Sequence, residues 1–177
     1  MKKLLLHICC GPCSTTVVER LAEAYDITGF FYNPNLYPED EYYRRLEAAR
    51  ASLKRFGVTF VEGPYEPDVF RQAVDGYEHE PENGARCPVC YRLRLTKTAE
   101  YAAENGFDIM ASTLTLGTQK KAVVINPVGH EVAVKAGILF LDGDWKKKDG
   151  FRRSIELSRE FDLYRQHYCG CEFSMRD

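Results

Sequence analysis

Near the start of the chain lies the stretch that decides its fold, Leu4-Leu5-Leu6-His7-Ile8-Cys9-Cys10-Gly11-Pro12-Cys13-Ser14. Residues 4–8 form a short apolar run, which predicts a buried strand. Gly11-Pro12 predicts a turn, and Cys13-Ser14 predicts the start of a helix after it. Cys9 and Cys10 therefore fall at the carboxyl end of the first strand, where open α/β sheets bind their ligands.

Short apolar runs continue along the chain and alternate with amphipathic segments. The runs predict strands at residues 4–8, 27–32, 58–61, 108–112 and 138–141. Between them, apolar side chains recur at helical spacing, as in Tyr42, Leu46, Ala49, Leu53 and Phe56. This alternation predicts a mainly parallel sheet flanked by helices, in the three-layer architecture of nucleotide-binding folds. We expect a single α/β domain over residues 1–177.

Two details of the helices are also expected. A C-terminal helix that docks the cysteine tail onto the domain is predicted by the stripe Leu157, Phe161, Tyr164 and Tyr168. The helix that follows Thr118 should break near Asn126-Pro127, because proline lacks a backbone N–H and clashes with the preceding turn.

The composition is that of a globular domain, with 177 residues of which 45% are hydrophobic and 28% charged. No apolar run approaches the ~20 residues that span a bilayer, and the first charges come too early for a signal peptide. A net charge of −2 limits any nucleic-acid surface to a local basic patch. We therefore expect a cytoplasmic monomer without membrane contact.

Cysteine is the unusual residue, because its seven copies form three groups: Cys9, Cys10 and Cys13, then Cys87 and Cys90, then Cys169 and Cys171. In a cytosolic chain such spacing indicates metal or redox chemistry more than structural disulfides. The thiolates of Cys9, Cys10, Cys87 and Cys90 could hold either a zinc ion or a 4Fe–4S cluster. Neighbouring cysteines point in divergent directions, which favours the wider cluster. The bland alternative makes Cys9 and Cys10 buried core residues.

The stretch Cys169-Gly170-Cys171 predicts a different kind of site. A single spacer closes a small, strained disulfide ring, and such a bond is labile and redox-active. The alternative is a frayed tail with two incidental thiols.

Several basic residues lie near these motifs in the sequence, among them Arg86, Lys120, Lys146 and Arg152. Together they could neutralise phosphates of a nucleic-acid substrate, although each alone is as well explained by a solvated helix face. No glycine-rich phosphate-binding motif occupies the first turn.

The chain resembles the cobalamin-independent epoxyqueuosine reductases, the QueH family, over essentially its full length. The resemblance rests on residues 7–13 (HICCGPC), 86–90 (RCPVC), 144–148 (DWKKK) and 164–171 (YRQHYCGC). One departure is Gly117-Thr118, where the family typically has Ser-Pro.

This resemblance implies reduction of epoxyqueuosine to queuosine at the wobble position of a tRNA anticodon. It implies a 4Fe–4S cluster at Cys9, Cys10, Cys87 and Cys90, and a redox-active pair at Cys169 and Cys171. We expect a second iron or other metal ion beside the cluster, held in part by Cys13, and an external electron donor that reopens the disulfide.

Two alternatives use the same cysteines without redox turnover. One is a zinc-dependent nucleotide or tRNA-modifying transferase. The other is an RNA-binding domain that zinc stabilises.

Overall fold

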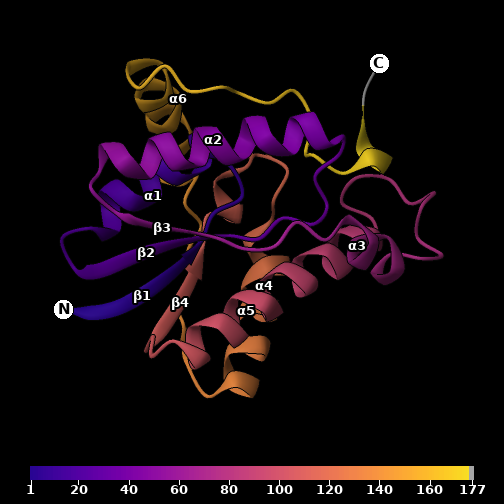
Figure 1. The fold of residues 1–177 in the computed structure, drawn as a ribbon, viewed down its shortest axis with the longest axis horizontal. Coiled ribbons are helices and arrows are strands. Elements are labelled where there is room, and N and C mark those ends of the chain that lie inside the picture. The colour runs from indigo at the N-terminus through magenta and orange to yellow at the C-terminus, as the bar shows by residue number, and fades with distance from the viewer. Residues whose placement is uncertain (176–177) are drawn as a thin grey trace.

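The computed structural model describes residues 1–175, which form one five-stranded sheet covered by helices (Figure 1). The strands are β1 Lys2–His7, β2 Tyr25–Phe31, β3 Thr59–Glu62, β4 Ile109–Ser112 and β5 Leu139–Phe140. All neighbours are parallel, in the order β3-β2-β1-β4-β5. The five predicted strands are confirmed. Residues 176–177, the end of the predicted domain, lie outside the described residues.

Helices cover both faces of this sheet (Figure 1). On one face lie α1 Gly11–Leu21 and α2 Glu39–Arg55, with α6 Gly150–Glu160 packed against α1. On the other face lie α4 Arg86–Glu104 and α5 Ala122–Ala136, with the short α3 Pro67–Ala73 in contact with α4. The predicted three-layer architecture is thus confirmed. Within residues 1–175, no helix is both long and apolar enough to cross a membrane.

The sheet order reverses its direction between β1 and β4. From β1 the chain builds outward to β2 and β3 on one side, and later to β4 and β5 on the other. The carboxyl ends of the strands at such a switch point border a crevice for ligands. Cys9 follows β1 there, and its backbone N–H donates to the hydroxyl of Thr113, which follows β4, at 3.1 Å. The fold thereby places the first cysteine group in the crevice.

The start of α1 lies directly against α2. The Cys10 side chain caps α1 by accepting a hydrogen bond from the backbone N–H of Cys13 at 3.2 Å. A Cβ atom on Gly11 would lie 2.7 Å from the backbone carbonyl carbon of Ala48 in α2. Only glycine lets the first cysteine group come this close to α2.

The expected break at Pro127 is wrong, because α5 continues through it. Pro127 lies on the exposed side of α5, and Val123, four residues earlier, is 82% exposed. The carbonyl of Val123, which loses its helical partner, can therefore bond to water, and that removes most of the cost of the missing N–H.

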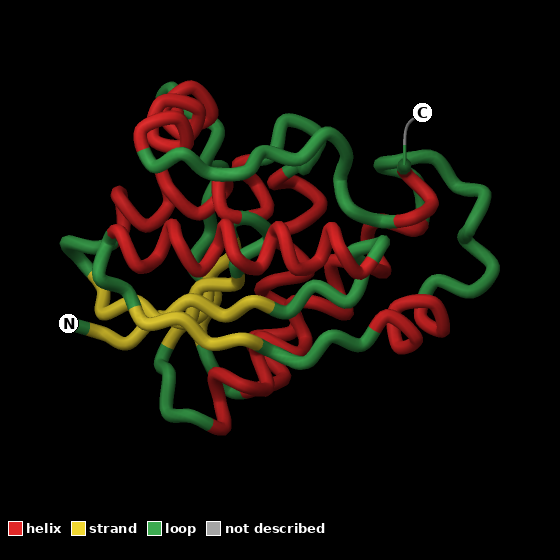
Figure 2. The backbone as a smooth tube through the Cα atoms, turned by 45° about the horizontal axis from the view of Figure 1, so that its top comes forward, coloured by secondary structure: helices red, strands yellow, loops and turns green. Residues whose placement is uncertain are grey.

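The last helix is also shorter than predicted, since α6 ends at Glu160. Asp162 adopts a left-handed conformation with φ of 55°, and the N–H of Leu163 turns back to the carbonyl of Ser158 at 2.9 Å. The C-terminal tail, residues 161–175, then runs along α2 without helical structure except for the short turn η2 Glu172–Ser174 (Figures 1 and 2).

A buried histidine in β1 gives the fold a pH dependence. His7 is fully buried, with Nδ1 3.1 Å from the Ser112 hydroxyl and Nε2 3.1 Å from the carbonyl of Tyr32. Burial, assisted by the nearby Arg94, lowers the pKa of His7 from 6.5 to about 3. Between about pH 3 and pH 6.5, His7 binds a proton in the unfolded chain but not in the folded chain.

The free energy of unfolding should therefore fall as the pH falls below 6.5. Between pH 7.5 and pH 5, His7 should lower it by about 2 kcal/mol, measured by urea unfolding followed by circular dichroism. His7→Gln should flatten this dependence, whereas His79→Gln, at an exposed position, should leave it unchanged. Equal dependence in both variants would contradict the assignment to His7.

Candidate active site

A cleft of about 330 Å³ opens at the carboxyl edge of the sheet. Its lining includes Cys9 and Cys13 after β1, Cys169 in the tail, and residues 116–120 after β4. A much smaller inner cavity, about 10 Å³, shares Cys169 with the cleft and is also lined by Cys87, Cys90 and Cys171. The three cysteine groups, far apart in the sequence, therefore meet at one site.

The first group forms a tight cluster of sulfur atoms. The sulfurs of Cys9, Cys10 and Cys13 all lie within 4.8 Å of one another. The hydroxyl of Thr113 donates to the sulfur of Cys9 at 3.3 Å. Three converging sulfurs are a suitable donor set for a thiolate-binding metal.

Cys10 and Cys13 are joined as a disulfide, which the sequence analysis did not predict. Cys169 and Cys171, for which a disulfide was expected, are free thiols. Because the thiolate is the metal ligand, Cys10 can bind a metal only once its bond to Cys13 is reduced.

The second group begins α4. Cys87 lies in the first turn of α4 and Cys90 directly after that turn, and each is 7% exposed. The N–H of Asn83 donates to the sulfur of Cys87 at 3.3 Å, and Nη1 of Arg94 lies 3.7 Å from the sulfur of Cys90. Burial raises the pKa of Cys90, and Arg94 opposes this effect. Buried thiols beside donors and a cation suit an anionic metal centre.

The third group is held by α2. Arg45, only 2% exposed, donates to the carbonyl of Cys169 at 2.9 Å and to that of Tyr168 at 2.8 Å. Glu41 orients Arg45 through an ion pair of 2.9 Å. Gly170 has φ of 114°, and a Cβ there would lie 2.6 Å from Nη1 of Arg45, so glycine is required. The predicted docking of the cysteine tail is confirmed, through backbone carbonyls rather than a helical stripe.

The two thiols of the tail differ in acidity. Burial alone would raise the pKa of Cys169, but the Lys120 ammonium and the Ser174 hydroxyl outweigh burial and lower it. Burial raises the pKa of Cys171 to about 11. Cys169, which also lines the open cleft, is therefore the more reactive thiol of the pair.

With this geometry in view, comparison with known proteins gives one family. The sequence model described as epoxyqueuosine reductase QueH matches residues 4–177. The chain belongs to the QueH family.

Curated QueH proteins are similar over nearly the whole chain. The one from Streptococcus pyogenes serotype M1 is 43% identical, covering 98% of this chain and 70% of its own length. The one from Haemophilus influenzae is 41% identical, and the match covers 99% of this chain and 72% of that protein. The one from Thermotoga maritima is 32% identical, and the match covers 99% of this chain and 91% of that protein.

Two solved structures share the fold of this QueH-family chain. One is the U34-tRNA thiolase NcsA from Methanococcus maripaludis with its 4Fe–4S cluster, which has a TM-score of 0.59 at 15% identity. The match covers 99% of this chain and 61% of the NcsA chain. The other is a predicted subunit of tRNA methyltransferase from Methanocaldococcus jannaschii, which has a TM-score of 0.57 at 13% identity. The match covers 90% of this chain and 76% of that subunit. At these identities the likeness concerns the fold alone.

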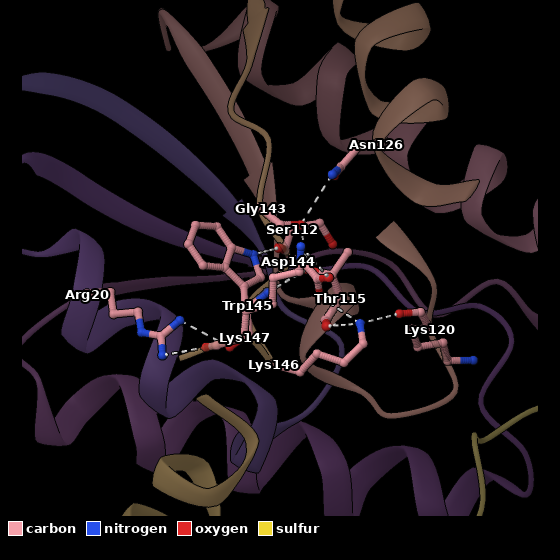
Figure 3. A network of polar contacts seen from close by, with 10 residues as sticks. All are labelled: Arg20, Ser112, Thr115, Lys120, Asn126, Gly143, Asp144, Trp145, Lys146 and Lys147. Carbon is pink, nitrogen blue, oxygen red and sulfur yellow. Dashed lines mark hydrogen bonds and ion pairs between the residues drawn. The ribbon is translucent and has the colours of Figure 1, made fainter. Parts of the chain in front are cut away.

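Two of the four basic residues expected to contact RNA have internal roles instead. Arg86 is 1% exposed, and its Nη1 donates to three backbone carbonyls in the loop 77–80. Lys146 donates to two carbonyls of the loop 115–120 and to the Asp144 carboxylate, at 2.8–2.9 Å (Figure 3). These are corrections, because the Arg86 guanidinium is buried and the Lys146 ammonium donates to three groups of the chain itself, so each charge orders a loop of the QueH-family chain.

The other two basic residues stay predictions. Lys120 lines both the cleft and the inner cavity, with Nζ 5.4 Å from the ring centroid of Tyr91. Arg152 lies on α6 with its side chain 77% exposed, 3.8 Å from the Glu156 carboxylate.

Sequence reasoning missed three residues of the site, namely Asn33, Arg45 and Thr113. Arg94 is one of the basic residues near the second cysteine motif, and its contact with Cys90 could have been predicted, because it lies four residues after Cys90 and hence on the same face of α4. Arg45 carried no such signal, since the carbonyl of Cys169 that it binds comes 124 residues later.

Proposed function

We propose that this chain reduces epoxyqueuosine in tRNA to queuosine. The family supports the reaction class, and one observation carries the assignment to this site: three cysteine groups meet around one cleft and its inner cavity at the switch point of the sheet. Removal of the epoxide oxygen as water consumes two electrons and two protons. Oxidation of two thiols to one disulfide releases the same number of each, so a dithiol beside the cleft balances the reaction.

The cluster that we propose is held by Cys9, Cys10, Cys87 and Cys90. The residues present fit it, since Cys9 and Cys10 converge with Cys13, while Cys87 and Cys90 are buried beside a cation. When bound, an iron–sulfur cluster supplies one-electron transfers. Cys13 lines the cleft, and its sulfur belongs to the same cluster of sulfurs, so it is the residue that we assign to a second iron or other metal ion.

Cys169 and Cys171 form the redox-active pair of this proposal. Arg45 fixes the backbone of Cys169, which lines the cleft, while Cys171 is buried at 5% exposure. The lowered pKa of Cys169 makes it the thiol that reacts first, and Cys171 closes the disulfide. An external electron donor then reopens that disulfide for the next turnover.

The tRNA substrate is contacted, in this proposal, by Lys120 in the cleft and by Arg152 on α6. We further propose that the protein acts on tRNA as a monomer in the cytoplasm.

The test begins with the metal content of protein purified without oxygen. We expect about four irons and four sulfides per chain, as in a cubane site with cysteine ligands, and any iron beyond four would occupy the second metal site. Incubation with tRNA that carries epoxyqueuosine, plus a reductant, should yield queuosine, detected by nucleoside mass spectrometry as the loss of one oxygen. Stoichiometric zinc without sulfide, and no such conversion, would favour the transferase or the RNA-binding alternative.

A further inference from the structure

A buried arginine lies against the second cysteine group. Arg94 is 4% exposed and sits one helical turn after Cys90 in α4. Its Nη1 lies 3.7 Å from the sulfur of Cys90. Its Nε and Nη2 both donate to the side-chain oxygen of Asn33, at 3.1 and 2.7 Å. The guanidinium therefore has one fixed orientation, with one edge on an amide and one N–H on a sulfur.

Asn33 is itself held in place by a hydrogen bond to the residue that follows β1. Its Nδ2 donates to the carbonyl of Ile8 at 2.9 Å, immediately before the first cysteine group. The amide can point its oxygen only toward Arg94 while this bond is kept. Through Asn33, the position of Arg94 is thus tied to the end of β1 as well as to α4.

The charge of Arg94 needs an anion near it. A buried guanidinium destabilises the fold strongly unless a negative group compensates its charge. Among the ion pairs within residues 1–175, none joins Arg94 to a carboxylate. The groups whose negative charge stabilises the protonated guanidinium are the sulfurs of Cys90, Cys9 and Cys169, with Nη1 of Arg94 on the sulfur of Cys90. Its countercharge is therefore on sulfur.

We propose that Arg94, held by Asn33, is a positioning residue that compensates the negative charge of the thiolate-bound cluster and sets its reduction potential. This inference rests on the proposed function, since it needs a cluster at this site. An electron from the external reductant adds one negative charge to the site. A fixed cation and an N–H···S hydrogen bond stabilise that added charge, which raises the potential. No bond forms or breaks on Arg94, which stays protonated throughout.

The experiment is an anaerobic redox titration with dithionite, followed by electron paramagnetic resonance of the reduced cluster. Arg94→Gln removes the charge and should lower the potential, with a one-electron reduction constant at least about tenfold smaller, equal to about 59 mV. Arg94→Lys keeps the charge but loses the planar guanidinium, so its reduction potential should lie between those of the unaltered protein and Arg94→Gln. The control is Arg92→Gln on the same helix, because Arg92 is exposed and pairs with Glu131 at 2.8 Å. Its potential should not change.

A second variant tests the same charge without touching the arginine. Asn33→Asp places a carboxylate against the guanidinium and should also lower the potential. Loss of the cluster in Arg94→Gln but not in Arg94→Lys would support the proposal, because charge is what differs between them. An unchanged potential in Arg94→Gln with iron and sulfide intact, or loss of the cluster in both Arg94 variants, would overturn it.

Failure of the proposed function would look different from either result. In that case the unaltered protein itself would hold no iron or sulfide, and it would show no reduced-cluster signal. If the unaltered protein holds the cluster and only the potential of the variants fails to move, the role of Arg94 is wrong and the proposed function stands.

Discussion

Replacing Cys87 by serine is expected to abolish both the metal centre and the activity of this chain. Changes in groups that only support a metal ligand typically cost 10–100-fold in affinity or activity, so loss of a ligand should cost more than about 100-fold. Cys87 is buried at the start of α4, and a serine hydroxyl there stays protonated and does not replace a thiolate. Iron and sulfide content, followed by the rate of queuosine formation, measures the effect.

The matched control for this result is Ala99→Ser, which places a serine at another buried position of the same helix. Its hydroxyl can bond to the carbonyl four residues earlier, so the variant should fold and keep its iron. Circular dichroism of both variants separates loss of the cluster from loss of the fold. Retention of iron and sulfide by Cys87→Ser at the level of the unaltered protein would contradict the ligand assignment.

Serine at Cys169 or Cys171 should leave the cluster in place but stop repeated turnover. Both thiols are needed to form one disulfide, so each single variant should lose more than about 100-fold in multiple-turnover rate, and the double variant little more. Such non-additivity is the mark of two groups that act as one unit. The measurements are iron content and the steady-state rate for all three variants.

Ser174→Ala provides the control for the tail. The Ser174 hydroxyl lies 3.0 Å from the sulfur of Cys169 and donates to the carbonyl of Cys171 at 3.0 Å, so the variant removes two contacts but keeps both thiols. It should cost no more than about 30-fold, since each of the two hydrogen bonds contributes about 1 kcal/mol. Full multiple-turnover activity in either serine variant at Cys169 or Cys171 would mean that these thiols do not carry the electrons.

The errors of the sequence analysis have a common physical origin. The stripe from Leu157 to Tyr168 has helical spacing, yet Asp162 takes a left-handed conformation and the tail instead packs on α2. Tyr164 still finds a partner there, since its hydroxyl donates to Glu41 at 2.8 Å. Arg86 and Lys146 are similar cases, because the carbonyls they bind become close only in the folded chain. Spacing alone cannot tell a cation that meets RNA from one that orders a loop.

By itself, the sequence determined the strand–helix order, the parallel sheet and the place of Cys9 at the end of β1. These features follow from apolar periodicity and turn residues, which act between neighbours in the chain. Only the tertiary structure decided that the three cysteine groups share one site, that Thr113 bonds to Cys9, and that Arg45 holds the tail. Several of these contacts join residues more than a hundred positions apart, as in Thr113 and Cys9, separated by 104. Such contacts depend on how whole layers pack, which no local pattern records.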